Sequence, residues 1–289
     1  MTDHLPMPIP APLTRAQRTS IVNLIRRTAK AEILPRFQTL SKHDIDQKTG
    51  PQDVVTEADR ASERMIARGL LGLFPNALIV GEEDVAENPE IVNKIADAEM
   101  AFTIDPVDGT WNFAHGMPLF GVILSMTRFG TPVFGLLYDP IMDDVIIAEE
   151  GGTAQLIRPR RAAQHLSVSD GGEIKDLTGF VGLHHLPEAK KAAQAATLPL
   201  FARVNTLRCA CHEFRMMAQG HVDFILSAGL TPWDHAAGAL AVQQAGGHVA
   251  LLDGSAYRAD AKRSQYLLCA ANKDLWDKLA EIYAFLLEE

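Results

Sequence analysis

Five acidic side chains in this sequence could together hold a divalent cation. They are expected at the ends of strands and helices rather than along helix faces: Asp59, Glu82, Asp105, Asp108 and Asp234. Carboxylates gathered from separate elements suit Mg²⁺, because this ion prefers oxygen ligands, retains waters and shares its remaining positions with substrate phosphate. Transition metals would demand more nitrogen or sulfur. The pattern therefore predicts a magnesium site and phosphate chemistry.

One hexapeptide, residues 105–110 (DPVDGT), is the most specific of these acidic segments. Its proline fixes φ and its glycine permits close backbone approach, so the turn would aim Asp105 and Asp108 into one site. Main-chain N–H groups of the following helix would then face an anion. Metal and phosphate are therefore expected to be neighbours.

The first half of the chain, residues 1–150, is predicted to be an α+β unit that supplies most of these acids. Apolar spacing predicts helices over residues 14–39 and 52–74, and short apolar runs indicate buried strands at 77–80 and 102–104. Glycine and proline then separate the strands of an antiparallel meander, expected at residues 120–128, 132–138 and 144–148.

The second half, residues 151–289, is predicted to be an α/β unit that contributes Asp234 and the substrate-side residues. Apolar strands alternate there with helical patterns, which is typical of α/β structure. The strands are expected at residues 178–183, 222–226 and 266–271, and the helices at 187–196, 211–218, 235–245 and 273–287.

Composition argues against several classes of function. The 289 residues include 27 Lys and Arg against 36 Asp and Glu, a net charge of -9, whereas a nucleic-acid surface needs clustered cations. An odd number of cysteines, three, fits a reducing compartment better than a disulfide scaffold, and Cys209 and Cys211 lack the spacing of a zinc pair and are expected to be small buried residues. The first 15 residues contain no apolar signal region, and no apolar run is long enough for a membrane span. A soluble cytoplasmic protein that binds neither membranes nor nucleic acid is expected.

Four segments resemble the inositol monophosphatase family of Mg²⁺-dependent, lithium-sensitive phosphatases. They occur in the family's order and read DVVTEAD (53–59), GEED (81–84), IDPVDGTWNF (104–113) and PWDHAAG (232–238). The resemblance implies the layered α-β-α-β-α sugar-phosphatase fold, which combines α+β and α/β features. It also implies two or three Mg²⁺ ions and a homodimer.

The resemblance also assigns the metal ligands. Glu82, Asp105 and the main-chain carbonyl of Val107 are expected to bind one ion. Asp105, Asp108 and Asp234 are expected to bind a second. Glu82 would in addition touch a third, weaker ion, so it is expected among the catalytic residues.

The remaining catalytic roles follow from the same resemblance. Thr110 and Asp59 are expected to position and activate the attacking water, so that no covalent phosphoenzyme is needed. Main-chain N–H groups of Gly109 and Thr110 would stabilise the phosphate. Lys48 would add positive charge near the metals.

Substrate recognition departs from the family pattern. The family commonly has Gly-Ser/Thr-Ala before a long helix, where this chain has Arg208, Cys209 and Ala210. The acid that usually lies seven residues before the last metal ligand is Ser227 here. Arg208, Ala210 and Ser227 are therefore expected on the substrate side together with Asp108, and Arg208 could bind a second phosphate or a carboxylate.

The sequence thus predicts a phosphomonoesterase for a small phosphorylated metabolite, with inositol monophosphate or a similar sugar phosphate as the leading substrate. Fructose 1,6-bisphosphate, 3′-phosphoadenosine 5′-phosphate and histidinol phosphate remain open. An alternative of another class is a regulatory protein-binding partner that retains the fold. A metal-dependent nuclease is disfavoured by the net charge.

Overall fold

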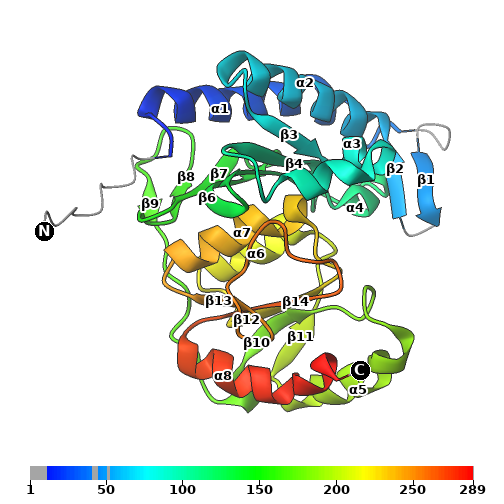
Figure 1. Cartoon of the computed structure of the whole chain (residues 1–289), viewed down its shortest axis with the longest axis vertical. Helices are drawn as coiled ribbons and strands as arrows, with labels where there is room; N and C mark the ends of the chain where they lie inside the picture. The colour runs from blue at the N-terminus through cyan, green and yellow to red at the C-terminus, as the bar shows by residue number, and fades with distance from the viewer. Residues whose placement is uncertain (1–11, 41–44, 51–52, 289) are drawn as a thin grey trace, which may run out of the picture.

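Two large β-sheets alternate with three layers of helices along the long axis of the molecule (Figure 1). The structure, a computed structural model, describes residues 12–40, 45–50 and 53–288, apart from the side chains of residues 48, 49 and 53. One helix layer covers the first sheet, a second lies between the sheets, and a third covers the outer face of the second sheet. The predicted mixed, layered fold class is confirmed.

The first large sheet carries the DPVDGT segment. Within the described residues its strands are, in spatial order, β3 (Leu78–Gly81), β4 (Ala101–Asp108), β5 (Gly121–Arg128), β6 (Thr131–Asp139), β7 (Asp144–Glu149), β8 (Gln155–Ile157) and β9 (Gln164–His165). β3 and β4 run parallel, whereas β5, β6 and β7 form the predicted antiparallel meander. Every residue of β4 is buried, as expected for a strand covered on both faces.

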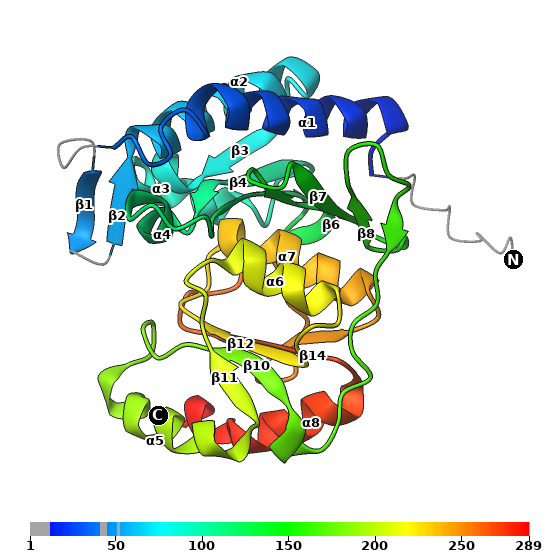
Figure 2. The same ribbon diagram turned by 180° about the vertical axis from the view of Figure 1, so that it is seen from behind.

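The second large sheet belongs to the later part of the chain. Its described strands are β11 (Arg203–Asn205), β10 (Thr178–Val181), β12 (Phe224–Ala228), β14 (Tyr266–Ala270) and β13 (His248–Leu251), in this spatial order. β10 runs parallel to β11 and β12, and the remaining pairs are antiparallel. From behind, the segment after β8 and β9 descends along one side of the molecule to β10 (Figure 2).

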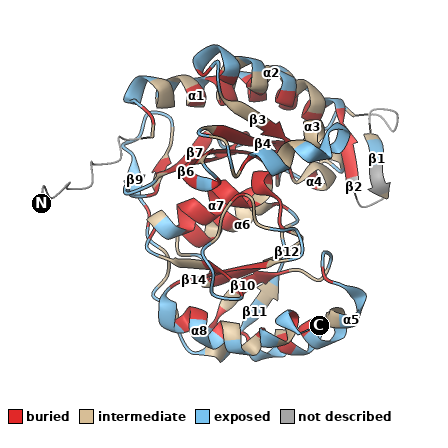
Figure 3. Ribbon diagram, viewed as in Figure 1, coloured by how far each residue is buried: buried red, intermediate tan, exposed pale blue. Residues whose placement is uncertain are grey.

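Helices form the other three layers. The outer layers contain α1 (Arg15–Thr28) and α2 (Glu57–Leu73) on the first sheet, and α5 (Glu188–Thr197) and α8 (Lys273–Ile282) on the second. Between the sheets lie α6 (Ala210–Ala218) and α7 (Pro232–Gln244). α7 is buried along most of its length, because both sheets cover it (Figure 3). None of the described helices is both long and apolar enough to cross a membrane.

Some predicted boundaries were wrong. The predicted helix at 14–39 is α1 followed by a π-helical turn, Ala29–Ile33. The predicted helix at 52–74 begins only at Glu57, because β2 (Asp53–Thr56) pairs with β1 (Ile45–Gly50). α7 begins three residues earlier than predicted, at a proline whose fixed φ suits a first helical position. The division near residue 150 stays a prediction, and the first sheet continues to β9.

Two short helices follow the strands that deliver acids. α3 (Glu82–Glu87) comes directly after β3, and α4 (Thr110–Ala114) follows β4 after one glycine. Neither helix was predicted as a separate element with these bounds. α3 begins at Glu82 and α4 at Thr110, two of the predicted catalytic residues, so the strand ends and helix starts at this edge of the sheet position the candidate site.

Candidate active site

The DPVDGT segment occupies the junction between β4 and α4. The register between β4 and β5 shifts between Asp105 and Asp108, which marks an irregularity in the strand at this point. Gly109 follows with a φ of +86°, a left-handed conformation that glycine adopts without steric cost. A Cβ at this position would lie 2.9 Å from the carbonyl oxygen of Leu119. The tight turn therefore requires glycine for two reasons.

Three carboxylates meet beside this turn. Oxygen atoms of Asp105, Asp108 and Asp234 lie within 4.8 Å of one another. Asp234 belongs to the first turn of α7, where the hydroxyl of Thr231 donates to its Oδ2 at 2.8 Å. Oδ1 of Asp105 accepts from the N–H of Val107 at 3.0 Å. The structure thus brings these three predicted ligands together.

Burial and mutual repulsion disfavour free charge in this cluster. Asp105 is only 3% exposed, and burial followed by the charge of Glu82 raises its pKa well above the usual value. Burial and then the charge of Asp234 raise the pKa of Asp108 to about 7. A divalent cation would relieve both effects. A set of carboxylate oxygens suits Mg²⁺ better than metals that need nitrogen or sulfur.

Asp108 is held by the amino end of α6, which lies a hundred residues further along the chain. Its Oδ2 accepts the N–H of Cys211 at 2.5 Å and the thiol of Cys209 at 3.0 Å. Burial raises the pKa of Cys209 well above its usual value, so the thiol stays protonated and can donate. The prediction that Cys209 and Cys211 are buried is confirmed. The hydrogen bond to Asp108 was not predicted.

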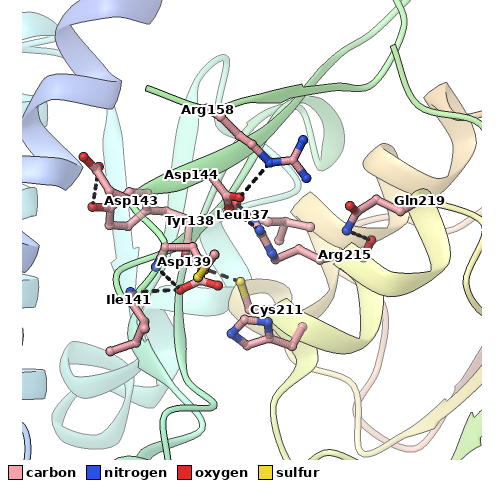
Figure 4. A network of polar contacts seen from close by, with 12 residues as sticks. Leu137, Tyr138, Asp139, Ile141, Asp143, Asp144, Arg158, Cys211, Arg215 and Gln219 are labelled. Carbon is pink, nitrogen blue, oxygen red and sulfur yellow. Dashed lines mark hydrogen bonds and ion pairs between the residues drawn. The ribbon is translucent and has the colours of Figure 1, made fainter. Parts of the chain in front are cut away.

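A buried ion pair fixes α6 against the first sheet (Figure 4). Arg215 of α6, 5% exposed, pairs with Asp144 of β7 and donates from Nη1 to the carbonyl of Leu137 at 2.8 Å. Arg158 approaches the second oxygen of Asp144 at 3.5 Å. The position of α6, and with it the hydrogen bonds made by its amino end, therefore depends on this network.

Asp59 and Thr110 contact each other from α2 and α4. Thr56 caps α2, and its N–H donates to Oδ2 of Asp59 at 2.8 Å in a capping box. The other oxygen of Asp59, Oδ1, lies 3.1 Å from the Thr110 hydroxyl. That hydroxyl also lies 3.0 Å from the carbonyl of Val107, so its single hydrogen can go to either acceptor. The structure brings the predicted Asp59–Thr110 pair together.

Glu82 lies at the neighbouring strand end. In the parallel pairing of β3 and β4, Gly81 stands opposite Ile104, so Glu82 and Asp105 follow at adjacent positions. The charge of Glu82 is accordingly the strongest charge effect on the pKa of Asp105. Among the described residues, the group of carboxylates within 4.8 Å of one another does not include Glu82. Glu82 therefore flanks the cluster.

The whole chain resembles a known family. It matches the description "Inositol monophosphatase family" over residues 15–288. The chain belongs to this family. It is 34% identical over 209 residues to an inositol-1-monophosphatase of Mesorhizobium japonicum, which covers 71% of this chain and 74% of the relative. The predicted resemblance is confirmed, and the chain is a phosphoric monoester hydrolase.

Two further relatives span more of the chain. A fructose-1,6-bisphosphatase/inositol-1-monophosphatase of Thermotoga maritima is 28% identical over 252 residues, covering 85% of this chain and 88% of the relative. The solved structure of the extragenic suppressor protein SuhB from Bartonella henselae has a TM-score of 0.75 at 26% identity, covering 92% of this chain and 97% of that chain. The family match over residues 15–288 thus extends over both sheets.

Two of the substrate-side positions expected from the family resemblance, Arg208 and Ala210, lie at the start of α6. The Arg208 guanidinium stacks on the Trp111 ring at 4.0 Å from its centroid. The backbone of Arg208 is left-handed, with a φ of +55°, at a position where the family pattern commonly has glycine. Ala210 begins α6, and Ser227 lies on β12. The side chain of Lys48 lies outside the described residues.

Two further residues beside the candidate site were not predicted: Thr231, which contacts Asp234, and Glu63, which contacts the backbone directly after Glu82. Thr231 lies three residues before Asp234, a spacing that resembles a helix-capping pattern and could have indicated the contact. Glu63 lies four residues after Asp59 on α2 and is 8% exposed. Residues four apart on a helix share one face, and this spacing was the available signal for Glu63.

Proposed function

We propose that this phosphatase is a Mg²⁺-dependent phosphomonoesterase that hydrolyses inositol monophosphate or a similar small sugar phosphate. The observation that carries the proposal is the contact between Asp59 and Thr110, the last residue of the segment that supplies Asp105 and Asp108 to the carboxylate cluster. Such a site combines a cation position with groups that can take a proton from water. Relatives named inositol-1-monophosphatase support this choice of substrate.

The proposed metal ligands are the carbonyl and carboxylate oxygens at the two strand ends and the start of α7. Glu82, Asp105 and the Val107 carbonyl would hold one Mg²⁺ ion. Asp105, Asp108 and Asp234 would hold a second, and Glu82 would touch a third. When bound, the ions supply positive charge to the phosphate oxygens and to the attacking water.

Asp59 is proposed to accept the proton of the attacking water through Thr110. A water beside the Thr110 hydroxyl can donate to its oxygen while the hydroxyl hydrogen moves to Oδ1 of Asp59. Oδ2 of Asp59 remains hydrogen-bonded to Thr56, which keeps the carboxylate oriented. Direct attack of this water on phosphorus needs no covalent phosphoenzyme.

Further contacts are proposed for the substrate. Main-chain N–H groups of Gly109 and Thr110 would donate to the phosphate oxygens. Lys48 would add positive charge. Asp108 and Ala210 would line the side of the pocket that receives the rest of the substrate.

A phosphate-release assay with and without Mg²⁺ tests this proposal. Asp108→Asn is expected to lower kcat at least about a hundredfold, because one negative ligand of the cation is lost. Asp277→Asn, on the exposed face of α8, is the matched control and should retain wild-type activity. Phosphate release that does not depend on Mg²⁺, or a normal rate for Asp108→Asn, would contradict the mechanism.

Arg208 favours a second candidate substrate class, in which the molecule carries another anion besides the cleaved phosphate. A left-handed φ costs a residue other than glycine about 1 kcal/mol or more, and the Trp111 stack holds the guanidinium in place. Fructose 1,6-bisphosphate and 3′-phosphoadenosine 5′-phosphate belong to this class. Histidinol phosphate also remains open, since Ser227 replaces the acid of the inositol-type pattern.

The ratio of kcat/KM for a bisphosphate to that for a monophosphate separates the two classes. Arg208→Gly should lower this ratio by about tenfold if the guanidinium binds the second anion, because a charge-assisted hydrogen bond contributes about 1.5 kcal/mol or more. Arg203→Gly, on exposed β11, is the matched control. An unchanged ratio in Arg208→Gly would reject the second class.

The family resemblance supports several further proposals: a homodimer, inhibition by lithium and a cytoplasmic location. Sedimentation of the purified protein and a lithium titration of phosphate release would test the first two. A regulatory role through protein binding is the alternative of another class. Retention of all five predicted acidic residues supports catalysis instead.

A further inference from the structure

Helix α2 presents a second buried carboxylate one turn after Asp59. Glu63 is 8% exposed, although charged side chains are seldom buried without partners. Its Oε2 accepts the N–H of Glu83 at 2.8 Å, and its Oε1 accepts the N–H of Asp84 at 2.9 Å. Both donors belong to the first turn of α3, so Glu63 caps this helix from a different element.

The residue before α3 is shaped to admit this carboxylate. Gly81 is the N-cap of α3 and has no side chain that could satisfy the helix donors. A Cβ at Gly81 would lie 2.1 Å from the carboxyl carbon of Glu63. Real atoms do not approach so closely, so glycine here and Glu63 on α2 depend on each other.

The surroundings of Glu63 disfavour its charged form. Burial raises the pKa of Glu63 to about 7, and the hydrogen bonds from Glu83 and Asp84 act against that shift. The neighbouring charges of Glu83 and Asp84 add to the cost. Through its two hydrogen bonds the Glu63 carboxylate fixes the start of α3, whose first residue is Glu82.

We propose that Glu63 is a positioning residue for Glu82 and thereby sets the Mg²⁺ affinity of the site that Glu82 shares with Asp105. The geometry supports this role because β3 pairs with β4 directly before these two acids. One face of α2 then supports both the activation of water and the binding of Mg²⁺. Asp59 contacts Thr110, and Glu63 orients the strand end that carries Glu82.

Because this role rests on the proposed function, the test measures Mg²⁺ binding itself. Calorimetric titration of the full-length protein with Mg²⁺, without substrate, should show about tenfold weaker binding for Glu63→Ala, as is usual when support for a metal ligand is lost. Glu63→Gln keeps one acceptor oxygen and should lie between Glu63→Ala and the wild type. Glu57→Gln removes an exposed charge from the same helix and should bind as the wild type does.

Gly81→Ala provides an independent variant, since it displaces the Glu63 carboxylate without altering its charge. It should weaken Mg²⁺ binding as Glu63→Ala does, and it decides the matter if Glu63→Ala fails to fold. Wild-type Mg²⁺ affinity in folded Glu63→Gln and Gly81→Ala proteins would overturn the positioning role, even if both melt at lower temperature. Absence of Mg²⁺ binding by the wild type would instead overturn the proposed function.

Discussion

The two sides of this active site are held in place in different ways. The acidic side consists of the five acidic residues and Thr110, and the substrate side of Arg208, Ala210 and Ser227. On the acidic side, Asp59 and Asp105 are 0% and 3% exposed, and each accepts a backbone hydrogen bond, from Thr56 and from Val107 respectively. On the substrate side, Arg208 is exposed and stacks on one aromatic ring.

This difference indicates which residues of the site can be substituted without loss of the fold. A buried carboxylate with fixed donors cannot change without leaving unsatisfied groups, so the reaction chemistry is tied to the fold. An exposed guanidinium can be exchanged at little cost to folding. The family can therefore share one reaction while its members differ in substrate, and the following predictions test that separation.

Arg215→Met should have the largest effect, because both sides depend on α6. Removing the guanidinium leaves Asp144 buried without its closest partner, which should lower the free energy of unfolding by about 3–5 kcal/mol. Urea denaturation measures this change. Arg64→Met, which breaks an exposed ion pair with Glu57, should cost less than about 1 kcal/mol. Equal losses in both variants would mean that the buried network does not anchor α6.

Thr110→Val should break the acidic side alone. It removes the hydroxyl beside Asp59, so kcat should fall about a hundredfold to a thousandfold, the range expected for a lost proton-transfer group. KM and the calorimetric Mg²⁺ affinity should stay near wild-type values. Thr153→Val, in an exposed loop, is the matched control. A parallel loss of Mg²⁺ binding would show that Thr110 acts on the metal cluster instead of on water.

The sequence predicted the acidic side better than the substrate side. Asp105 and Asp108 share one short motif, so local turn chemistry was enough to bring them together. The same reasoning failed at residues 53–56, where pairing with β1 overrides the helix expected there. It also missed the hydrogen bonds from Cys209 and Cys211 to Asp108, because they join segments about a hundred residues apart and depend on how α6 docks.

The stabilisation of the folded protein by Mg²⁺ should distinguish the acidic side from the substrate side. At a free concentration of about 100 times Kd, binding to the folded state alone adds about 2.7 kcal/mol. For a domain of this size that should raise Tm by about 5 °C, measurable by differential scanning fluorimetry. Asp105→Asn should abolish most of the shift, whereas Arg208→Lys should keep it. A shift lost in Arg208→Lys would place that side chain within the metal site and end the distinction between the two sides.

Cys209 offers the smallest and most local test, because it adjoins Arg208 in sequence and yet donates to Asp108. Cys209→Ala removes one donor while the N–H of Cys211 remains, so the expected loss is about 1 kcal/mol, or roughly a fivefold lower kcat/KM. Cys209→Ser restores a donor and should recover most of the activity. The ratio of bisphosphate to monophosphate hydrolysis should stay unchanged in both variants, because the Arg208 side chain is held by Trp111. If Cys209→Ala altered this ratio as much as Arg208→Gly does, the Asp108 carboxylate and the Arg208 guanidinium would act as one unit. The reaction and the choice of substrate could then not vary independently.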